Sequence, residues 1–150
     1  MTTVEEKPIT AGRSMSQVVT DTVRTFRGQV PECITAALVD MSTGMLLAVD
    51  TLDDQQPDEQ LDLLAAATFD LFQGRNVSII RDVFVDRHTA SDRHYFQEML
   101  VNSDDLVHLF LRSNRHQDLV AVVVCKRVSN IGMLFAQARV VMKQMDADFA

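Results

Sequence analysis

The sequence predicts an α/β (α+β) fold, an α/β/α sandwich in which helices cover both faces of a five-stranded antiparallel sheet. Two apolar runs flank a turn rich in Ser, Thr and Gly at residues 40–44, which is typical of a β-hairpin. Three more apolar runs between residues 95 and 125 are joined by short polar segments, so they too form antiparallel neighbours. Segments whose apolar residues recur at helical spacing lie before these strands, between the two groups of strands, and after them. The predicted order is helix-strand-strand-helix-strand-strand-strand-helix.

Composition favours a single folded domain. The chain has 150 residues, of which 47% are hydrophobic and 23% charged, so it is long enough to bury one core. Residues 1–13 are polar and without periodicity, and we expect a flexible leader there, followed by one domain at residues 14–150.

The charge balance limits the partners that we expect. The net charge of −7 argues against broad binding to nucleic acid or to anionic membranes, because both need clustered Lys and Arg. We find neither the apolar core of a signal peptide nor a stretch long enough to span a bilayer. We therefore expect a cytoplasmic protein with no nucleic-acid partner and no membrane insertion.

The first helix and the first hairpin have clear local signals. Ser14 suits the N-cap of a helix whose apolar stripe runs to Phe26, and Gly28 and Pro31 end the pattern. The following strands, at residues 34–39 and 45–49, have apolar residues at both odd and even positions. This pattern predicts that helices cover both faces of the sheet there.

The helix predicted at residues 61–72 has two apolar faces. One stripe suits the sheet. The other face would lie in water in a monomer, and its small side chains would let a second helix approach closely, which favours a helix-to-helix interface. The alternative is a helix buried wholly within its own subunit. The sheet-facing stripe comprises Leu61, Leu64, Ala65, Thr68, Leu71 and Phe72, and the second face Leu63, Ala66, Ala67 and Phe69.

Gly74 is typical of a helix end, yet helical spacing resumes from Val77 to Phe84, so the helix either runs on or restarts after a kink. Residues 86–93 are polar, and we expect a loop. The three strands that follow are predicted at residues 95–101, 106–112 and 119–125. The last is apolar throughout, as in a central strand, whereas the first carries Gln97 and Glu98, as in an edge or interface strand.

The last helix has the cleanest periodicity of the chain. Ser129 or Asn130 would cap it. Its apolar residues recur at intervals of three and four and are Ile131, Leu134, Phe135, Ala138, Val141, Met142 and Met145.

Few residues suggest metal or thiol chemistry. Cys33 and Cys125 fall in predicted strands without zinc-site spacing, so we interpret them as buried reduced thiols whose pKa is raised by apolar neighbours. A cross-strand pair is the alternative. His88 and His94 could supply two metal ligands, but the Arg beside each repels a cation. A solvated polar loop is the favoured interpretation, with no metal and no cofactor.

The sequence also lacks the elements of an enzyme. Arg75, Arg81, Arg87 and Arg93 recur at six-residue intervals, and one of them could act as an arginine finger, although surface arginines are favoured. There is no phosphate-cradling glycine-rich loop with its Lys. No acid, base and nucleophile converge, so we predict no catalytic residue.

Three segments resemble the Roadblock family of dynein light-chain-like domains, which includes prokaryotic members that partner small Ras-like GTPases. They are ALVDMSTGMLL at residues 37–47, LLAAA at 63–67 and IGML at 131–134. Their order and spacing carry the likeness, which covers about residues 14–145. The helical pattern at residues 76–85 and the loop after it depart from the family.

The resemblance implies a homodimer in which central helices pair and edge strands join two sheets into one. It also implies that the first and last helices share one sheet face and that the chain is not an enzyme but binds and regulates or scaffolds a small Ras-like GTPase or a related complex. The residues expected in the dimer interface are Leu63, Ala66, Ala67, Phe69, Asp70, Tyr95, Gln97 and Met99.

A small-ligand sensor of the PAS or GAF kind is the alternative function, because those domains also wrap helices around an antiparallel sheet. A ligand pocket between sheet and helix would distinguish it.

Overall fold

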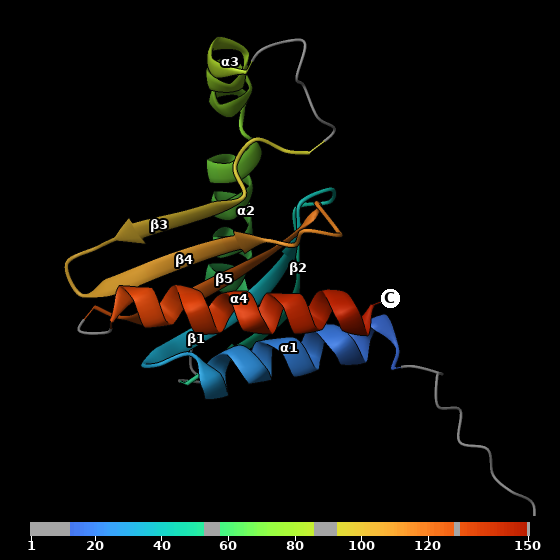
Figure 1. Cartoon of the computed structure of the whole chain (residues 1–150), viewed down its shortest axis with the longest axis vertical. Helices are drawn as coiled ribbons and strands as arrows, with labels where there is room; N and C mark the ends of the chain where they lie inside the picture. The colour runs from blue at the N-terminus through green and yellow to red at the C-terminus, as the bar shows by residue number, and fades with distance from the viewer. Residues whose placement is uncertain (1–12, 53–57, 86–92, 128–129, 150) are drawn as a thin grey trace, which may run out of the picture.

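The computed structural model describes residues 13–52, 58–85, 93–127 and 130–149, with residues 58–62 described by their backbone alone. The predicted fold class and element order are confirmed, and the central helical region consists of two helices (Figure 1). In chain order the elements are α1 (Met15–Gln29), β1 (Cys33–Asp40), β2 (Met45–Thr51), α2 (Asp58–Gln73), α3 (Arg75–Phe84), β3 (Glu98–Asn102), β4 (Leu106–Arg112), β5 (Leu119–Lys126) and α4 (Ile131–Asp148).

The five strands form one sheet in the order β2-β1-β5-β4-β3, and every neighbouring pair is antiparallel. β5 is central and buried along nearly its whole length, as its apolar sequence predicts. β2 and β3 are the edge strands. The first hairpin turns at Gly44, whose φ of +74° lies in the left-handed region that favours glycine.

α1 and α4 lie side by side on one face of the sheet (Figure 1). Ser14 caps α1 through a reciprocal pair of hydrogen bonds with Gln17, and Asn130 caps α4 by accepting from the backbone N–H of Met133 at 3.1 Å. Arg13, placed in the leader by the sequence, forms ion pairs with Asp21 and Asp148. The buried side chains between this helical layer and the sheet include Val18, Val23, Phe26, Leu38, Leu109, Leu134 and Met145.

α2 covers the opposite face of the sheet over a second core. Ala65, Thr68 and Phe72 are buried there, and the ring of Phe72 packs 5.8 Å from that of Phe110. Leu71 is 41% exposed, so its predicted place on the covered stripe is wrong. The buried positions follow one another at intervals of three and four, and this narrow line leaves Leu71 on the flank of the helix.

β3 begins at Glu98, three residues later than predicted. The backbone carbonyl of Phe96 accepts a hydrogen bond from the side chain of Arg112 at 2.9 Å, and no ladder pairing reaches back to Tyr95. The segment at residues 93–97 is therefore held mainly by side chains instead of by strand pairing. The loop predicted at residues 86–93 lies outside the described residues except for Arg93.

Gly74 separates α2 from α3, so the helix restarts instead of running on. A Cβ atom at Gly74 would lie 2.6 Å from the carbonyl oxygen of Asp70, a distance that real Cβ contacts do not reach. Only glycine fits this junction without a shift. Beyond it α3 stands past the end of α2, outside the β3 edge of the sheet (Figure 1). Across the described parts of the chain, no helix has the length and apolar character that crossing a membrane would need.

Candidate interaction surface

The outward face of α2 is exposed in this single chain. The side chain of Leu63 is 67% exposed, and Ala66, Ala67 and Asp70 are exposed with it, whereas Phe69 is half-buried against the core beneath α2. The alternative in which α2 is buried wholly within its own subunit is therefore wrong. An apolar side chain of this size beside two alanines forms a surface that another helix can approach closely.

The second candidate surface is the free edge of β3, which pairs with β4 on one side only. Met99 is half-buried and packs on the core beneath α2, so it lies on the same side of the sheet as that helix. Glu98 points to the other side, where its carboxylate accepts two hydrogen bonds from Arg139 of α4, at 2.9 and 2.7 Å. This edge has unpaired backbone groups that a second strand could pair.

Tyr95 and Gln97 lie just before β3, next to the turn between β4 and β5. The Tyr95 ring packs 5.0 Å from that of Phe96. The side chain of Gln97 donates to the backbone carbonyl of His94 at 2.7 Å and exchanges hydrogen bonds with Gln117. The structure thus places both predicted interface residues near the β3 edge, with the amide of Gln97 engaged within the chain.

Arg112 holds this region together, and sequence reasoning missed it. Its guanidinium donates to Gln73 at the end of α2, to the carbonyl of Phe96, and to the carbonyl of Gln117, at 2.8, 2.9 and 2.5 Å. It also lies over the ring of Phe72, 5.1 Å from the centroid. Burial lowers the pKa of Arg112 to about 10, so it stays charged at neutral pH. The signal in the sequence is an arginine that ends a strand whose other residues are apolar except for His108.

The outer face of α3 is a further surface that the interface prediction did not include. None of its residues is buried, although the helix is strongly amphipathic. Its main packing partner is α2. The large apolar side chains on it are Ile79, Ile80, Val83 and Phe84, exposed by 54%, 40%, 70% and 74%.

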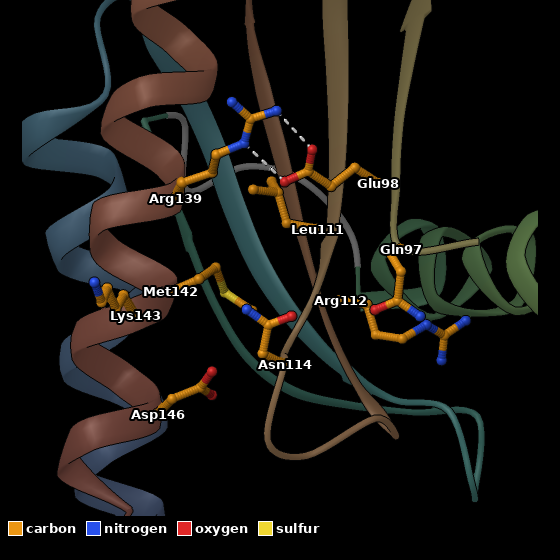
Figure 2. Close-up of a pocket in the computed structure, with 9 residues that line it drawn as sticks. All are labelled: Gln97, Glu98, Leu111, Arg112, Asn114, Arg139, Met142, Lys143 and Asp146. Carbon is orange, nitrogen blue, oxygen red and sulfur yellow. Dashed lines mark hydrogen bonds and ion pairs between the residues drawn. The ribbon is translucent and has the colours of Figure 1, made fainter. Parts of the chain in front are cut away.

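A cavity of about 470 Å³ lies on the other side of the sheet, between α4 and the edge formed by β3 and β4 (Figure 2). It is open to solvent, and the ion pair of Glu98 and Arg139 forms part of its lining. The guanidinium of Arg112 points away from α4 in this view. A ligand sensor is expected to have a largely apolar, enclosing pocket, which this is not. The lining residues are Gln97, Glu98, Leu111, Arg112, Asn114, Arg139, Met142, Lys143 and Asp146.

Cys33 and Cys125 are both buried, as predicted, and no disulfide joins them in this structure. The expectation that both thiols have a raised pKa is wrong for Cys33. Its pKa is lowered, mainly by the neighbouring thiol of Cys125 and also by the nearby guanidinium of Arg27. The pKa of Cys125 is raised by the neighbouring Cys33 and by burial.

The predicted polar-loop residues give no metal centre where the structure can be described. His88 and Arg87 lie outside the described residues. Burial lowers the pKa of His94, whose ring lies 3.6 Å from the carboxylate of Asp118. Within the described ranges no three His, Cys, Asp or Glu side chains converge as metal ligands would. Arg93 binds Asn114 and Gln97, as a surface side chain does.

Comparison with solved structures shows a Roadblock-type fold. The Roadblock/LC7 domain from Streptomyces avermitilis matches with a TM-score of 0.63 and 17% identity, over 84% of this chain and 92% of that one. The gliding protein MglB from Thermus thermophilus matches with a TM-score of 0.64 and 14% identity, over 91% and 92%. MglC from Myxococcus xanthus matches with a TM-score of 0.52 and 15% identity, over 85% and 96%. No protein-family model matches the sequence, and no curated protein does.

Proposed function

Starting from this Roadblock-type fold, we propose that the chain is a non-enzymatic homodimeric interaction module that binds a small Ras-like GTPase, or a related complex, and regulates or positions it. The observation that carries the proposal is the joint exposure of apolar side chains on α2 and α3 next to the free edge of β3. Apolar patches of this kind mark interaction sites.

The dimer that we propose forms about a two-fold axis near β3. α2 ends beside the segment that leads into β3, because Arg112 binds both Gln73 and Phe96. A second copy placed about that axis brings its α2 alongside the first and its β3 against the free edge. The interface then contains Leu63, Ala66, Ala67, Phe69 and Asp70 from α2 and Tyr95, Gln97 and Met99 from the β3 region.

The same arrangement gives α3 a cover. α3 stands outside the β3 edge of its own sheet (Figure 1). The proposed dimer therefore places α3 over the partner protomer. Its large apolar side chains then meet the partner protomer beside the paired α2 helices, where they are removed from water. We therefore assign the apolar face of α3 to the second copy of this chain.

The GTPase partner follows from the family resemblance and from what this chain lacks. The sequence has no phosphate-binding loop of its own, so nucleotide hydrolysis would take place on the partner. A dimer with one continuous sheet presents a broad rigid surface to such a partner. We place this interaction in the cytoplasm.

Light scattering coupled to size exclusion tests the dimer at micromolar concentration. We expect a wild-type dimer and a largely monomeric Ala67→Glu variant, because a carboxylate between paired helices is desolvated without a partner. The matched control is Ala136→Glu, an exposed alanine of α4 on the opposite sheet face, which should remain dimeric. A wild-type monomer, or an Ala67→Glu variant as dimeric as the control, would contradict the interface.

Isothermal titration with a small Ras-like GTPase from the same organism tests the partner. The GTPase is loaded in parallel with GDP and with a non-hydrolysable GTP analogue, since a regulator must distinguish two states of its target. We expect tighter binding to one of the two forms and no GTP hydrolysis by the chain alone. Hydrolysis by the chain alone would show it to be an enzyme, and equal or absent binding would exclude a regulator of that GTPase.

A further inference from the structure

Cys33 and Cys125 are direct partners in the ladder between β1 and β5, although 92 positions separate them in sequence. Both side chains point into the core beneath α1 and α4, where Cys33 is 7% exposed and Cys125 is fully buried. The fold thus brings two buried thiols to facing positions on neighbouring strands. The residues next to either cysteine in the sequence do not indicate this pairing.

The ladder geometry fits a disulfide at this place. The backbone N–H of Lys126 donates to the carbonyl of Glu32 at 3.1 Å, so the pair one step outward is the hydrogen-bonded one. Cys33 and Cys125 therefore occupy a non-hydrogen-bonded position, next to a shift in register between Cys33 and Thr35. At such a position of a regular ladder, facing Cα atoms approach to about 4.5 Å. A disulfide joins Cα atoms that are about 4.4–6.8 Å apart.

The surroundings of Cys33 favour its thiolate, which is the reactive form of a cysteine. Arg27 of α1 donates from Nη1 to the carbonyl oxygen of Cys33 at 2.7 Å, which keeps its positive charge beside that residue. The neighbouring thiol of Cys125, and to a smaller extent the charge of Arg27, lower the pKa of Cys33. In the reduced form the Cys33 thiol donates a hydrogen bond to the carbonyl oxygen of Thr35 at 3.5 Å. Cys33, with its small exposed fraction, is also the more accessible of the two.

We infer that Cys33 and Cys125 are a redox modification site, which hydrogen peroxide converts into a reversible disulfide within one chain. The Cys33 thiolate attacks one oxygen of hydrogen peroxide, and the O–O bond breaks. Hydroxide is the leaving group, and Cys33 becomes a sulfenic acid. The sulfur of Cys125 then attacks that of Cys33; the S–O bond breaks, and the released hydroxide takes the thiol proton. In balance, two thiols are oxidised and one peroxide is reduced to two waters.

The disulfide would join β1 to β5 at the end of the sheet where Arg27 attaches α1. It closes a loop running from residue 33 to residue 125, and a loop of that length strongly restricts the unfolded chain. We expect oxidation to raise Tm by at least about 5 °C. This site stands apart from the proposed interface, so it does not depend on the dimer or on the GTPase.

Alkylation in denaturant followed by intact-mass measurement tests the site on the full chain. Untreated protein should accept two alkyl groups, and peroxide-treated protein none, with a mass lower by two hydrogen atoms. Dithiothreitol should restore both thiols. Non-reducing electrophoresis should show single chains, and calorimetry should show the higher Tm.

Two single variants separate the roles of the thiols. Cys125→Ala should stop at a sulfenic acid on Cys33, which dimedone traps, because no resolving sulfur remains. Cys33→Ala should retain a free Cys125 after the same treatment. Persistence of two alkylation sites in treated wild-type protein, cross-links only between chains, or an unchanged Tm would overturn the proposal.

Discussion

At the scale of single residues, Arg112 shows how a buried charge can organise a surface. Its three hydrogen-bond acceptors come from the end of α2, from the segment before β3 and from the turn after β4. One guanidinium thereby joins three parts of the chain that are far apart in sequence. Because each acceptor lies at the border of the proposed interface, the side chain positions that interface without belonging to it.

Replacing Arg112 therefore tests how much its hydrogen bonds stabilise the folded chain. We expect Arg112→Met to lower the free energy of unfolding by about 3 kcal/mol, since three acceptors lose a buried charged donor. Urea denaturation of the variant measures the change. Arg24→Met, at an exposed position of α1, is the matched control and should change stability by less than about 0.5 kcal/mol. Equal effects of the two substitutions would contradict the role of Arg112.

Two glycines in helical surroundings predict opposite responses to alanine. A Cβ at Gly74 meets the Asp70 carbonyl at 2.6 Å, whereas a Cβ at Gly28 meets nothing within 4 Å. Gly74→Ala should destabilise the protein by about 1–3 kcal/mol through this clash. Gly28→Ala should stabilise it by about 0.5–1 kcal/mol through helix propensity. Chemical denaturation of both variants checks the sign, and a stabilised Gly74→Ala variant would contradict the close approach.

At the scale of elements, α3 differs from every other helix described because none of its residues is buried. α1 and α4 contribute long rows of side chains to a core, and α2 contributes a shorter one. An amphipathic helix without a cover retains little of the stability that packing supplies. Its conformation in the free chain should therefore be the least protected among the helices.

Hydrogen exchange measures that difference directly. In a monomeric sample, such as the Ala67→Glu variant, amides of α3 should exchange at least about 100-fold faster than those of β5, because local opening exposes no core. In the wild-type dimer, protection of α3 should increase, since the second copy covers its apolar face. Protection of α3 that is the same in both samples would assign that face to another partner.

At the scale of the whole molecule, the two helical layers cover the sheet to different extents. α1 and α4 close one face of the sheet with two helices and a large core, while α2 alone covers the other face. The exposed apolar side chains of α2 and α3 all lie on or beyond this thinner side. One face of the sheet is thus covered by two helices, and the other by a single helix whose outward side chains are exposed.

Association makes thermal stability depend on protein concentration. In the proposed dimer a tenfold rise in concentration should raise Tm by about 2–4 °C, because mass action favours the state in which folded chains pair. Differential scanning fluorimetry over two decades of concentration measures this slope. The Ala67→Glu variant should give a slope near zero, and a flat wild-type curve would contradict a dimer linked to folding.

Much of this architecture is encoded locally, which is why the sequence predicts it. Ser14 and Asn130 cap helices through bonds that reach three residues along the chain. The turn before β2 is held by Asp40, which accepts a hydrogen bond from the backbone of Ser42 at 2.9 Å. The periodicity of apolar residues then assigns each segment its buried face.

The sequence by itself determined the order of elements, the antiparallel sheet, the capped helices and the two-faced character of α2, because each depends on neighbours within a few residues. Only the tertiary structure decided where β3 starts, that Leu71 is exposed, and that Cys33 faces Cys125 beside Arg27. These features arise from groups far apart in the chain. Their energies depend on distance and burial in the folded molecule, which the local pattern of residues does not contain.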